Sequence, residues 1–217
     1  MKSCSWIGAE AVRLAIHEPG ALGRAVELLR RGELVAFPTD TVYGVGAHAF
    51  LEQAVKRLFR VKKRPLDLPI PLLLSEESTM EMVCTDIPPV AWRLAECFWP
   101  GGLSLVLARS QVVPDAVTAG GSTVAVRIPD YPLLRDLCRQ LGAPLAATSA
   151  NLHRQPPPVT ADEVESVLGG YIPLILDGGA CPGGVASTVL DLTVWPHAIV
   201  RPGPVSAAQL ATVTTLS

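Results

Sequence analysis

The sequence predicts one α/β domain over residues 1–217, in which helices flank a twisted mixed sheet of parallel and antiparallel strands. In the first half, stretches with helical spacing of apolar residues alternate with short apolar runs typical of buried strands. In the second half, strands crowd together, which favours a mixed sheet over a purely parallel one. The chain has no internal repeat and no long linker, so we expect a single core at about 18–205.

The helices follow from apolar residues three or four positions apart, and two of them from capping boxes. Thr160 with Glu163, and Ser206 with Gln209, have the spacing in which two side chains satisfy free backbone groups at a helix start. The ranges expected to be helical are 21–31, 51–61, 90–98, 131–140, 160–168 and a short final turn after Ser206.

The strands follow from short apolar runs between turn residues. In 123–128 the apolar side chains alternate, which places Arg127 on the opposite face from Val124 and Val126. The expected strands are 34–37, 72–74, 103–108, 123–128, 145–147, 174–176, 188–190 and 198–200.

The stretch 37–48 is the part around which the chain is organised. A buried strand runs into Pro38, two threonines, an aspartate and Tyr43, and then into Gly44 and Gly46. Each glycine allows a positive φ or a close approach of another group to the backbone. Two interpretations stay open: a polar turn between a strand and a helix, or a ligand loop at the carboxyl edge of the sheet.

Composition and charge exclude several classes of protein. The net charge of −2 predicts no overall attraction to nucleic acid or to an anionic membrane, although residues 56–64 hold six basic side chains and no acid. The five cysteines are far apart, so we expect neither a zinc site nor a disulfide framework, as is typical of a cytoplasmic protein. Residues 1–6 lack the apolar stretch of a signal peptide, and no run is long enough to cross a membrane.

Five strand ends or loops offer hydroxyl, amide or basic groups to a ligand. An arginine fork suits carboxylates and phosphates, a lysine supplies a point charge, and hydroxyls and amides orient ligand oxygens. Taken singly, each arginine could be a structural ion-pair partner, Ser149 and Asn151 could cap a helix, and the basic run could be a solvated helix face. The five groups are Thr39/Thr41/Tyr43, Lys62/Arg64, Thr123/Arg127, Ser149/Asn151 and Ser187/Thr188/Arg201.

Several nucleotide-binding and hydrolase motifs are absent from the sequence. It contains no G-x-x-x-x-G-K-[ST], no G-x-G-x-x-G after a strand, no G-x-S-x-G and no H-E-x-x-H. Any chemistry is therefore expected to depend on positioning and charge, without a covalent nucleophile.

Seven short motifs follow one another along the chain, namely FPTDTVYGVG (37–46), KKRP (62–65), WPGGLSLVL (99–107), TVAVRIP (123–129), SAN (149–151), STVLD (187–191) and RPG (201–203). In this order they resemble the YrdC family of threonylcarbamoyl-AMP synthases. The resemblance covers about 21–203, and the chain length resembles the short form without the further C-terminal domain of longer relatives.

The resemblance implies an enzyme that joins L-threonine, bicarbonate and ATP into threonylcarbamoyl-AMP and releases pyrophosphate. The product feeds the N6-threonylcarbamoyladenosine modification of tRNA by a downstream transferase, and Mg2+ is expected on the ATP phosphates. The resemblance assigns threonine to Thr39, Thr41, Tyr43, Arg127 and Ser187. It assigns ATP to Lys62, Arg64, Thr123, Ser149, Asn151 and Arg201, with Lys62 and Arg64 as the catalytic pair.

The sequence departs from the family pattern in the nucleotide and threonine loops. Lys63 stands where the family has glycine, and Leu68 where a polar residue is common. A histidine that many members have after the next strand is replaced within 72–74, around Leu73. The other departures are His153-Arg154 after the SAN motif and Pro157 in place of a serine. Two alternatives remain: a carbamoyl-adenylate-forming domain of the carbamoyltransferase type, which is usually fused to partner domains, and a module that binds double-stranded RNA or tRNA without catalysis.

Overall fold

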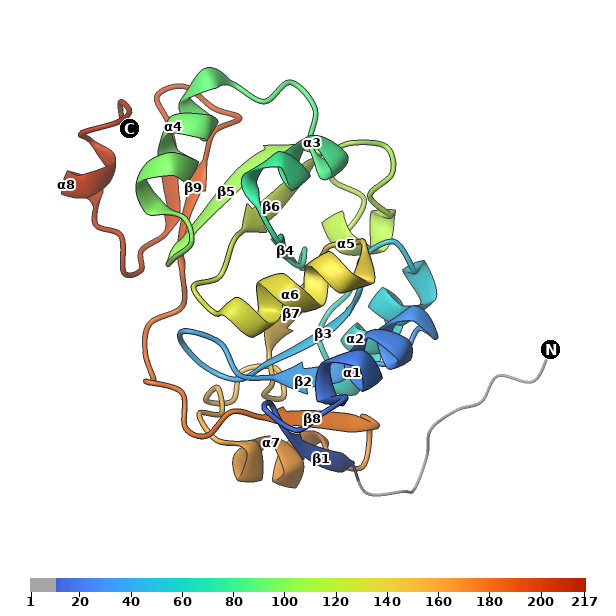
Figure 1. Cartoon of the computed structure of the whole chain (residues 1–217). Helices are drawn as coiled ribbons and strands as arrows, with labels where there is room; N and C mark the ends of the chain where they lie inside the picture. The colour runs from blue at the N-terminus through green and yellow to red at the C-terminus, as the bar shows by residue number, and fades with distance from the viewer. Residues whose placement is uncertain (1–10) are drawn as a thin grey trace.

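The computed structural model describes residues 11–217, so residues 1–6, for which no signal peptide is predicted, lie outside the described part. Ten strands of that part form one sheet in the order β1-β8-β2-β3-β7-β4-β6-β5-β9-β10 (Figure 1). The sheet contains parallel pairs, such as β2 with β8 and β4 with β6, and antiparallel pairs, such as β2 with β3 and β5 with β6. The predicted mixed α/β sheet is therefore confirmed.

The elements have the following bounds. The strands are β1 (Val12–Ala15), β2 (Val35–Phe37), β3 (Gly44–His48), β4 (Leu72–Leu73), β5 (Leu103–Ala108), β6 (Thr123–Arg127), β7 (Leu145–Ser149), β8 (Leu174–Asp177), β9 (Thr188–Asp191) and β10 (Ala198–Arg201). The helices are α1 (Ala21–Arg30), α2 (Glu52–Lys62), η1 (Glu77–Thr79), α3 (Met80–Val83), α4 (Pro89–Phe98), α5 (Asp115–Thr118), α6 (Pro132–Leu141), α7 (Ala161–Leu168) and α8 (Ala207–Leu210).

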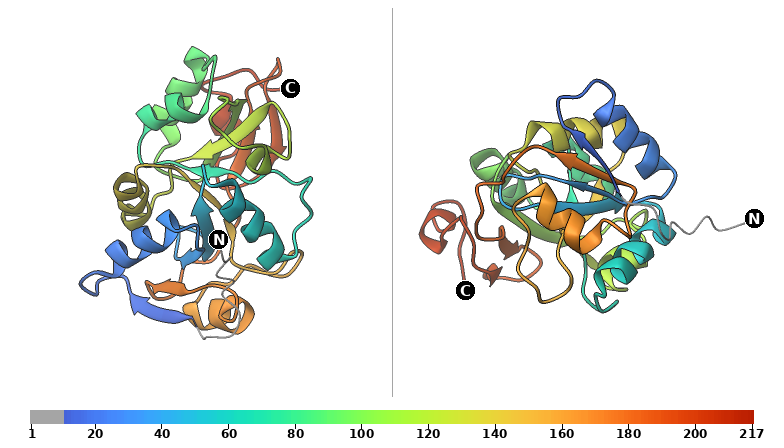
Figure 2. Two further views of the ribbon diagram at one scale, coloured as in Figure 1. Left: turned by 90° about the vertical axis from the view of Figure 1, so that its right-hand side faces the viewer. Right: turned by 90° about the horizontal axis from the view of Figure 1, so that it is seen from below.

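Helices cover both faces of the sheet. Helices α1 and α6 pack side by side on one face, and their leucines form a buried cluster with Val35 and Phe37 of β2. Figure 2 shows α2 and α7 on the opposite face, where Leu58 of α2 and Val164 of α7 join a larger cluster with Ala36. The alternation of side chains along β2 thus feeds both clusters, as the period of a strand requires. None of the helices within 11–217 combines the length and the apolar character needed to cross a membrane.

Strand β3 was missing from the sequence prediction, which treated its glycines as part of a turn or ligand loop. Gly44 and Gly46 are extended residues that pair with Phe37 and Val35 of β2. A Cβ at Gly44 would lie 2.8 Å from the Phe37 ring, and one at Gly46 would lie 2.9 Å from it. The glycines are needed because the ring of Phe37 lies across them, so their role is close approach, without a positive φ.

Both capping boxes are confirmed at the starts of α7 and α8. Four short elements were not predicted, namely β1, η1, α3 and α5, because pieces of three or four residues have too little periodicity to be recognised. Strand β1 pairs with β8 before the predicted core begins, and α8 with its buried Leu210 lies after the core ends.

Candidate active site

The loop 38–43 between β2 and β3 is closed by the hydroxyl of Thr39. This hydroxyl donates to the carbonyl of Val42 at 2.7 Å and accepts from the backbone N–H groups of Thr41 and Val42 at 3.0 and 3.2 Å. The Thr41 hydroxyl lies 3.0 Å from it, close enough for a further hydrogen bond. Thr39 therefore shapes the loop, whereas the side chain of Asp40 contacts a residue outside it.

Arg127 reaches this loop from the end of β6. Its Nε donates to the carbonyl of Gly101 at 2.7 Å, and its Nη2 donates to Oδ2 of Asp40 at 2.5 Å. Arg127 is 8% exposed. Burial lowers its pKa, and the neighbouring Asp40 carboxylate partly restores it. The guanidinium is held in one orientation by two partners from distant parts of the chain.

Arg201 forms a second fixed guanidinium near Arg127. Its Nε and Nη2 donate to the carbonyl of Ser187 at 3.1 and 2.8 Å, and Nη2 also reaches the Ser187 hydroxyl at 3.1 Å. That hydroxyl lies 2.8 Å from the hydroxyl of Ser104 in β5. Burial lowers the pKa of Arg201, and the positive charge of Arg127 lowers it further, so the two charges lie within electrostatic reach. Gly203 allows the Arg201 segment to lie against residues 187 and 188, because a Cβ at position 203 would lie 2.3 Å from the Thr188 nitrogen.

Tyr43 joins the loop 38–43 to the end of β8. It is fully buried. Its hydroxyl donates to the carbonyl of Gly179 at 2.8 Å and accepts from the Gly178 N–H at 3.2 Å. Burial raises the pKa of this hydroxyl well above its usual range, so the phenol stays neutral. Beside it, burial also raises the pKa of the Cys181 thiol, to which the Thr39 N–H points. Tyr43 thus supports the wall of the site as a neutral anchor.

Lys62 is a buried ammonium at the end of α2. It is 2% exposed, and its Nζ donates to the carbonyl of Asn151 at 2.7 Å and to that of Ser149. Burial, with a smaller effect of the Arg64 charge, lowers the pKa of Lys62 to about 7. An ammonium has three donors, so one remains for a ligand. Lys63 is exposed, which identifies Lys62 as the lysine that faces the SAN motif.

The residue between Lys62 and Arg64 has a left-handed backbone. Lys63 caps α2 with φ 50° and ψ 37°, a conformation that glycine adopts at less cost. This explains why the resembled family has glycine here. Arg64 then folds back, and its Nη2 donates to the carbonyl of Pro69 at 3.0 Å. Its Nε reaches the carbonyl of Leu68 at 3.4 Å, so the contact uses the backbone and leaves the Leu68 side chain out.

The sheet register places Thr123 and Ser149 together and Arg127 away from them. Leu73 of β4 is level with Arg127 of β6 and with Leu145 of β7. Because β4 runs parallel to β6 and antiparallel to β7, Thr123 and Ser149 lie four positions from that row in the same direction. Both therefore lie at the sheet edge where Lys62 and Arg64 gather, whereas Arg127 is at the other end of β6.

Asn151 completes the second group. Its Nδ2 donates to the carbonyls of Leu152 and Gln155, each at 2.7 Å, and closes that loop. Among residues 11–217, Oδ1 of Asn151 and Oδ1 of Asp40 are buried acceptors that no protein donor reaches. Such acceptors are costly unless a donor is supplied, so each of the two groups has an unused acceptor for a ligand.

The predicted site residues, together with Asp40, therefore form two connected groups. Gly44 links them, because it pairs with Phe37 next to the loop 38–43 and with Ser149 next to Lys62. The first group, the arginine group, comprises Thr39, Asp40, Thr41, Tyr43, Arg127, Ser187 and Arg201. The second group, the lysine group, comprises Lys62, Arg64, Thr123, Ser149 and Asn151.

Two residues that contact members of the arginine group, Asp40 and Ser104, were not predicted from the sequence. In the sequence, Asp40 stands out only as part of the motif 37–46, and Ser104 only as part of the predicted strand 103–108. Each contacts a predicted residue across more than eighty positions of sequence, Asp40 with Arg127 and Ser104 with Ser187. The Thr-Asp-Thr pattern was the only available signal for Asp40, and nothing local identified Ser104.

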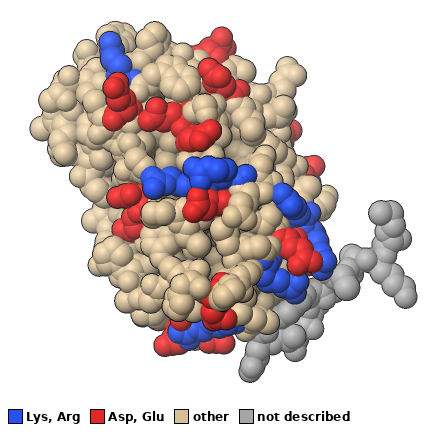
Figure 3. Space-filling view, in the orientation of Figure 1, with Lys and Arg blue, Asp and Glu red and all other residues tan. Residues whose placement is uncertain are grey.

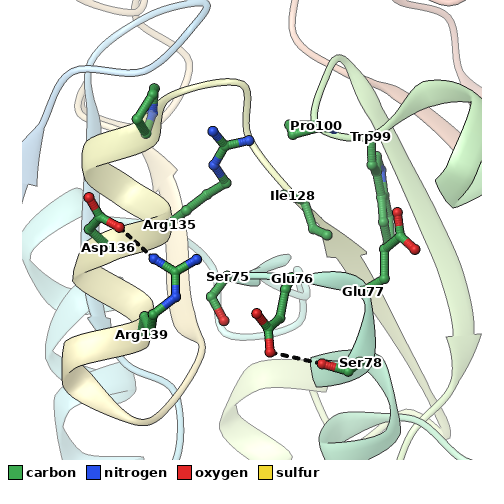
Figure 4. A pocket seen from close by; sticks show the side chains of 11 residues that line it. Ser75, Glu76, Glu77, Ser78, Trp99, Pro100, Ile128, Arg135, Asp136 and Arg139 are labelled. Carbon is green, nitrogen blue, oxygen red and sulfur yellow. Dashed lines mark hydrogen bonds and ion pairs between the residues drawn. The ribbon is translucent and has the colours of Figure 1, made fainter.

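A separate cavity of about 520 Å³ is lined by Pro100 and Ile128, the sequence neighbours of Gly101 and Arg127. Figure 4 shows Arg135 and Arg139 of α6 on one wall and Trp99 and Pro100 on the other. None of the predicted site residues lines it. Ile128 at its floor directly follows Arg127, so the cavity adjoins the site without containing its polar groups.

The basic run 56–64 does not form a continuous basic surface. Lys56 pairs with Glu52 at 2.7 Å, Arg57 pairs with Glu33, and Lys62 is buried. On the face shown in Figure 3, basic and acidic side chains are interspersed. This arrangement gives little support to an RNA-binding module whose affinity rests on that run.

The match to a family model covers residues 27–203; the model is that of Sua5, YciO and YrdC, described as "Telomere recombination". This is more than half of the chain. The chain belongs to the Sua5/YciO/YrdC family. The resemblance found in the sequence motifs is thereby confirmed, and with it the YrdC-like fold.

Three known proteins place the chain within the family. The threonylcarbamoyl-AMP synthase of Pyrococcus abyssi is 44% identical over 189 residues, which are 87% of this chain and 56% of that protein. The enzyme of that name from Bacillus subtilis is 40% identical over 98% of this chain and 62% of its own length. A crystal structure of P. abyssi Sua5 complexed with L-threonine superposes with a TM-score of 0.87 at 41% identity, over 96% of this chain and 62% of that one. The chain thus spans about three fifths of these relatives.

Proposed function

We propose that the protein is a nucleotidyltransferase that forms threonylcarbamoyl-AMP and pyrophosphate from L-threonine, bicarbonate and ATP. The observation that carries this proposal is the charge of the arginine group. Of the two fixed guanidiniums, Arg127 has the carboxylate of Asp40 in ion-pair contact, and Arg201 has no carboxylate in ion-pair contact among the described residues. The arginine group as a whole therefore keeps one net positive charge, which favours anionic substrate groups such as the carboxylate of an amino acid and a phosphate. The L-threonine in the P. abyssi relative is consistent with an amino-acid ligand.

The arginine group binds L-threonine and the lysine group binds ATP, and Arg201 is the member of the arginine group that also contacts the nucleotide. Arg127 binds the threonine carboxylate, and Ser187 and Thr41 supply hydroxyls near it. Lys62, Arg64 and Arg201 bind the nucleotide and its phosphates, while Thr123, Ser149 and Asn151 orient its polar groups. Gly44 and Tyr43 connect the groups through rigid backbone pairing, so both substrates are held relative to one another.

The reaction then needs alignment and positive charge. The neutral threonine amine attacks the carbon of carbon dioxide, or that of bicarbonate, from which a hydroxide leaves. The nitrogen then loses a proton, which with bicarbonate leaves as water together with the hydroxide, and a carbamate forms. A carbamate oxygen attacks the α-phosphorus in line, the bond to the β-phosphate oxygen breaks, and pyrophosphate leaves with that electron pair. Lys62 and Arg64 stabilise the negative charge that develops on the phosphate oxygens.

Magnesium, the later partners and the location belong to the same proposal. In residues 11–217, no three metal-binding side chains lie close enough together to hold an ion. We therefore expect Mg2+ to arrive on the triphosphate of ATP, where it offsets phosphate charge. The product is passed to a tRNA threonylcarbamoyl-transferase in the cytoplasm, and any direct contact with tRNA or other double-stranded RNA is a property additional to catalysis.

Pyrophosphate release from ATP tests the proposal. We expect release only when both L-threonine and bicarbonate are present. Release that depends on carbamoyl phosphate would favour the carbamoyltransferase alternative, and RNA binding without release under any condition would favour the binding module. Arg127→Lys is the matched variant, because it keeps the charge but loses the fork; it should raise KM for threonine more than KM for ATP.

A further inference from the structure

The carboxylate of Asp40 is used on one side only. Its Oδ2 accepts from Nη2 of Arg127 at 2.5 Å. Its Oδ1 is buried, and no donor within residues 11–217 reaches it. The two side chains are 17% and 10% exposed, so this ion pair is largely removed from solvent. A buried acceptor without a donor is unfavourable, which marks Oδ1 as an atom that a bound group can satisfy.

Arg127 has donors left next to this oxygen. A guanidinium carries five N–H groups, and the described contacts use Nε for Gly101 and one N–H of Nη2 for Asp40. Both N–H groups of Nη1 make no hydrogen bond to the described residues. A ligand carboxylate can therefore accept from Nη1 of Arg127, while Asp40 accepts from Nη2 of the same guanidinium. In an α-amino acid, one carbon separates the carboxylate from the amine. A carboxylate bound to Arg127 therefore brings the amine close to the Asp40 carboxylate.

Other polar groups around Asp40 do not compete for a cation. The Cys181 thiol is adjacent, and burial raises its pKa, so it carries no negative charge near neutral pH. The Thr39 hydroxyl is used within its loop. Ser187 contacts Arg201 and Ser104. Asp40 is the acid that the described contacts place at this arginine.

We propose that Oδ1 of Asp40 accepts a hydrogen bond from the α-amino group of the bound amino acid, and that Asp40 thereby selects α-amino acids over 2-hydroxy acids. This inference rests on the proposed function, because it concerns the threonine side of the same site. Asp40 has two tasks: Oδ2 orients Arg127 for the carboxylate, and Oδ1 holds the nitrogen that becomes the nucleophile. The hydroxyl of a 2-hydroxy acid can also donate to Oδ1, but it carries no positive charge, so the Asp40 carboxylate favours the charged amine.

The test compares two ligands that differ only at this group. L-threonine and 2,3-dihydroxybutanoate of the same configuration share the carboxylate and the β-hydroxyl, but the second has a hydroxyl in place of the amine. Calorimetric titration of the wild-type protein should show a preference of about tenfold or more for L-threonine, the range of a charged hydrogen bond. Asp40→Asn keeps an acceptor for Arg127 and should abolish that preference.

The control variant separates selection from mere orientation. Arg127→Lys perturbs the carboxylate end, so it should weaken both ligands by a similar factor and leave the preference in place. An Asp40→Asn protein that weakens both ligands equally, or neither, would show that Asp40 only orients Arg127. If that variant does not fold, the wild-type ratio decides, because equal affinities overturn the inference. No binding of L-threonine by the wild type would instead refute the proposed function.

Discussion

Nucleotide affinity should fall as pH rises above about 7, because of Lys62. Burial lowers the pKa of this ammonium from 10.5 to about 7 in the free protein. A phosphate that takes the remaining donor favours the charged form and raises the pKa again. Between the two pKa values, binding a nucleotide therefore takes up a proton. The affinity then falls by up to a factor of ten for each pH unit, equivalent to about 1.4 kcal/mol.

The stability of the free protein should change in the opposite direction. The folded-state pKa of Lys62 is lower than that of the unfolded chain, so above about pH 7 the unfolded chain holds a proton that the folded protein has lost. The free energy of unfolding therefore rises with pH between about 7 and 10.5, and the cost of the buried charge is fully present below 7. If nucleotide affinity falls with pH while the free energy of unfolding rises over the same range, both changes are explained by Lys62.

Calorimetric titration with a non-hydrolysable ATP analogue from pH 7 to 8.5 provides the measurement. We expect a loss of about tenfold in affinity over this range for the wild type. Lys62→Met should bind more weakly at pH 7 and show little further loss, whereas Lys63→Met, the exposed neighbour, should behave as the wild type. Titration of the phosphate itself is common to all three proteins. A wild-type slope equal to that of Lys62→Met would refute the reasoning.

Three further predictions test local structure and catalysis. Lys63→Gly relieves the left-handed strain and should change the free energy of unfolding by between 0 and about +1 kcal/mol in denaturant titration, whereas Lys56→Gly inside the exposed face of α2 should cost about 1 kcal/mol. A cost for Lys63→Gly equal to that of Lys56→Gly would contradict the assigned φ. Gly46→Ala should destabilise the protein by about 1–3 kcal/mol, because its Cβ meets the Phe37 ring, and an unchanged denaturation midpoint would argue against this packing. Arg64→Ala should lose about 2 kcal/mol or more of transition-state binding in kcat/KM, and unchanged turnover would remove Arg64 from catalysis.

The sequence was sufficient for the elements with strong periodicity or capping signals. Strand β5 has its predicted bounds, and α7 and α8 begin at their predicted capping boxes. It was insufficient for β3, because Gly44 and Gly46 have neither the alternation nor the propensity of a strand. Their place in the sheet is decided by Phe37, whose ring occupies the space over both glycines. Such a requirement is tertiary, and no local pattern expresses it.

The sequence predicted which residues belong to the candidate site better than it predicted how they are arranged. The five groups of polar residues were found from strand ends and from the family motifs. Their division into two groups depends on the register of β4 with β6 and β7, which separates Thr123 from Arg127 on the same strand. The role of Asp40 depends on an ion pair that joins residues 87 positions apart. The burial of Lys62 beneath two carbonyls likewise became visible only in the folded chain.

The measurement that tests the central claim most directly is the identity of the product. The protein, MgATP, L-threonine and 13C-bicarbonate are mixed, and the nucleotides are analysed at once by mass spectrometry. We expect an adenylate that contains threonine and is heavier by the label than the product from unlabelled bicarbonate, in amounts equal to the pyrophosphate released. An adenylate without the label, or pyrophosphate release without any threonine-containing adenylate, would contradict the account.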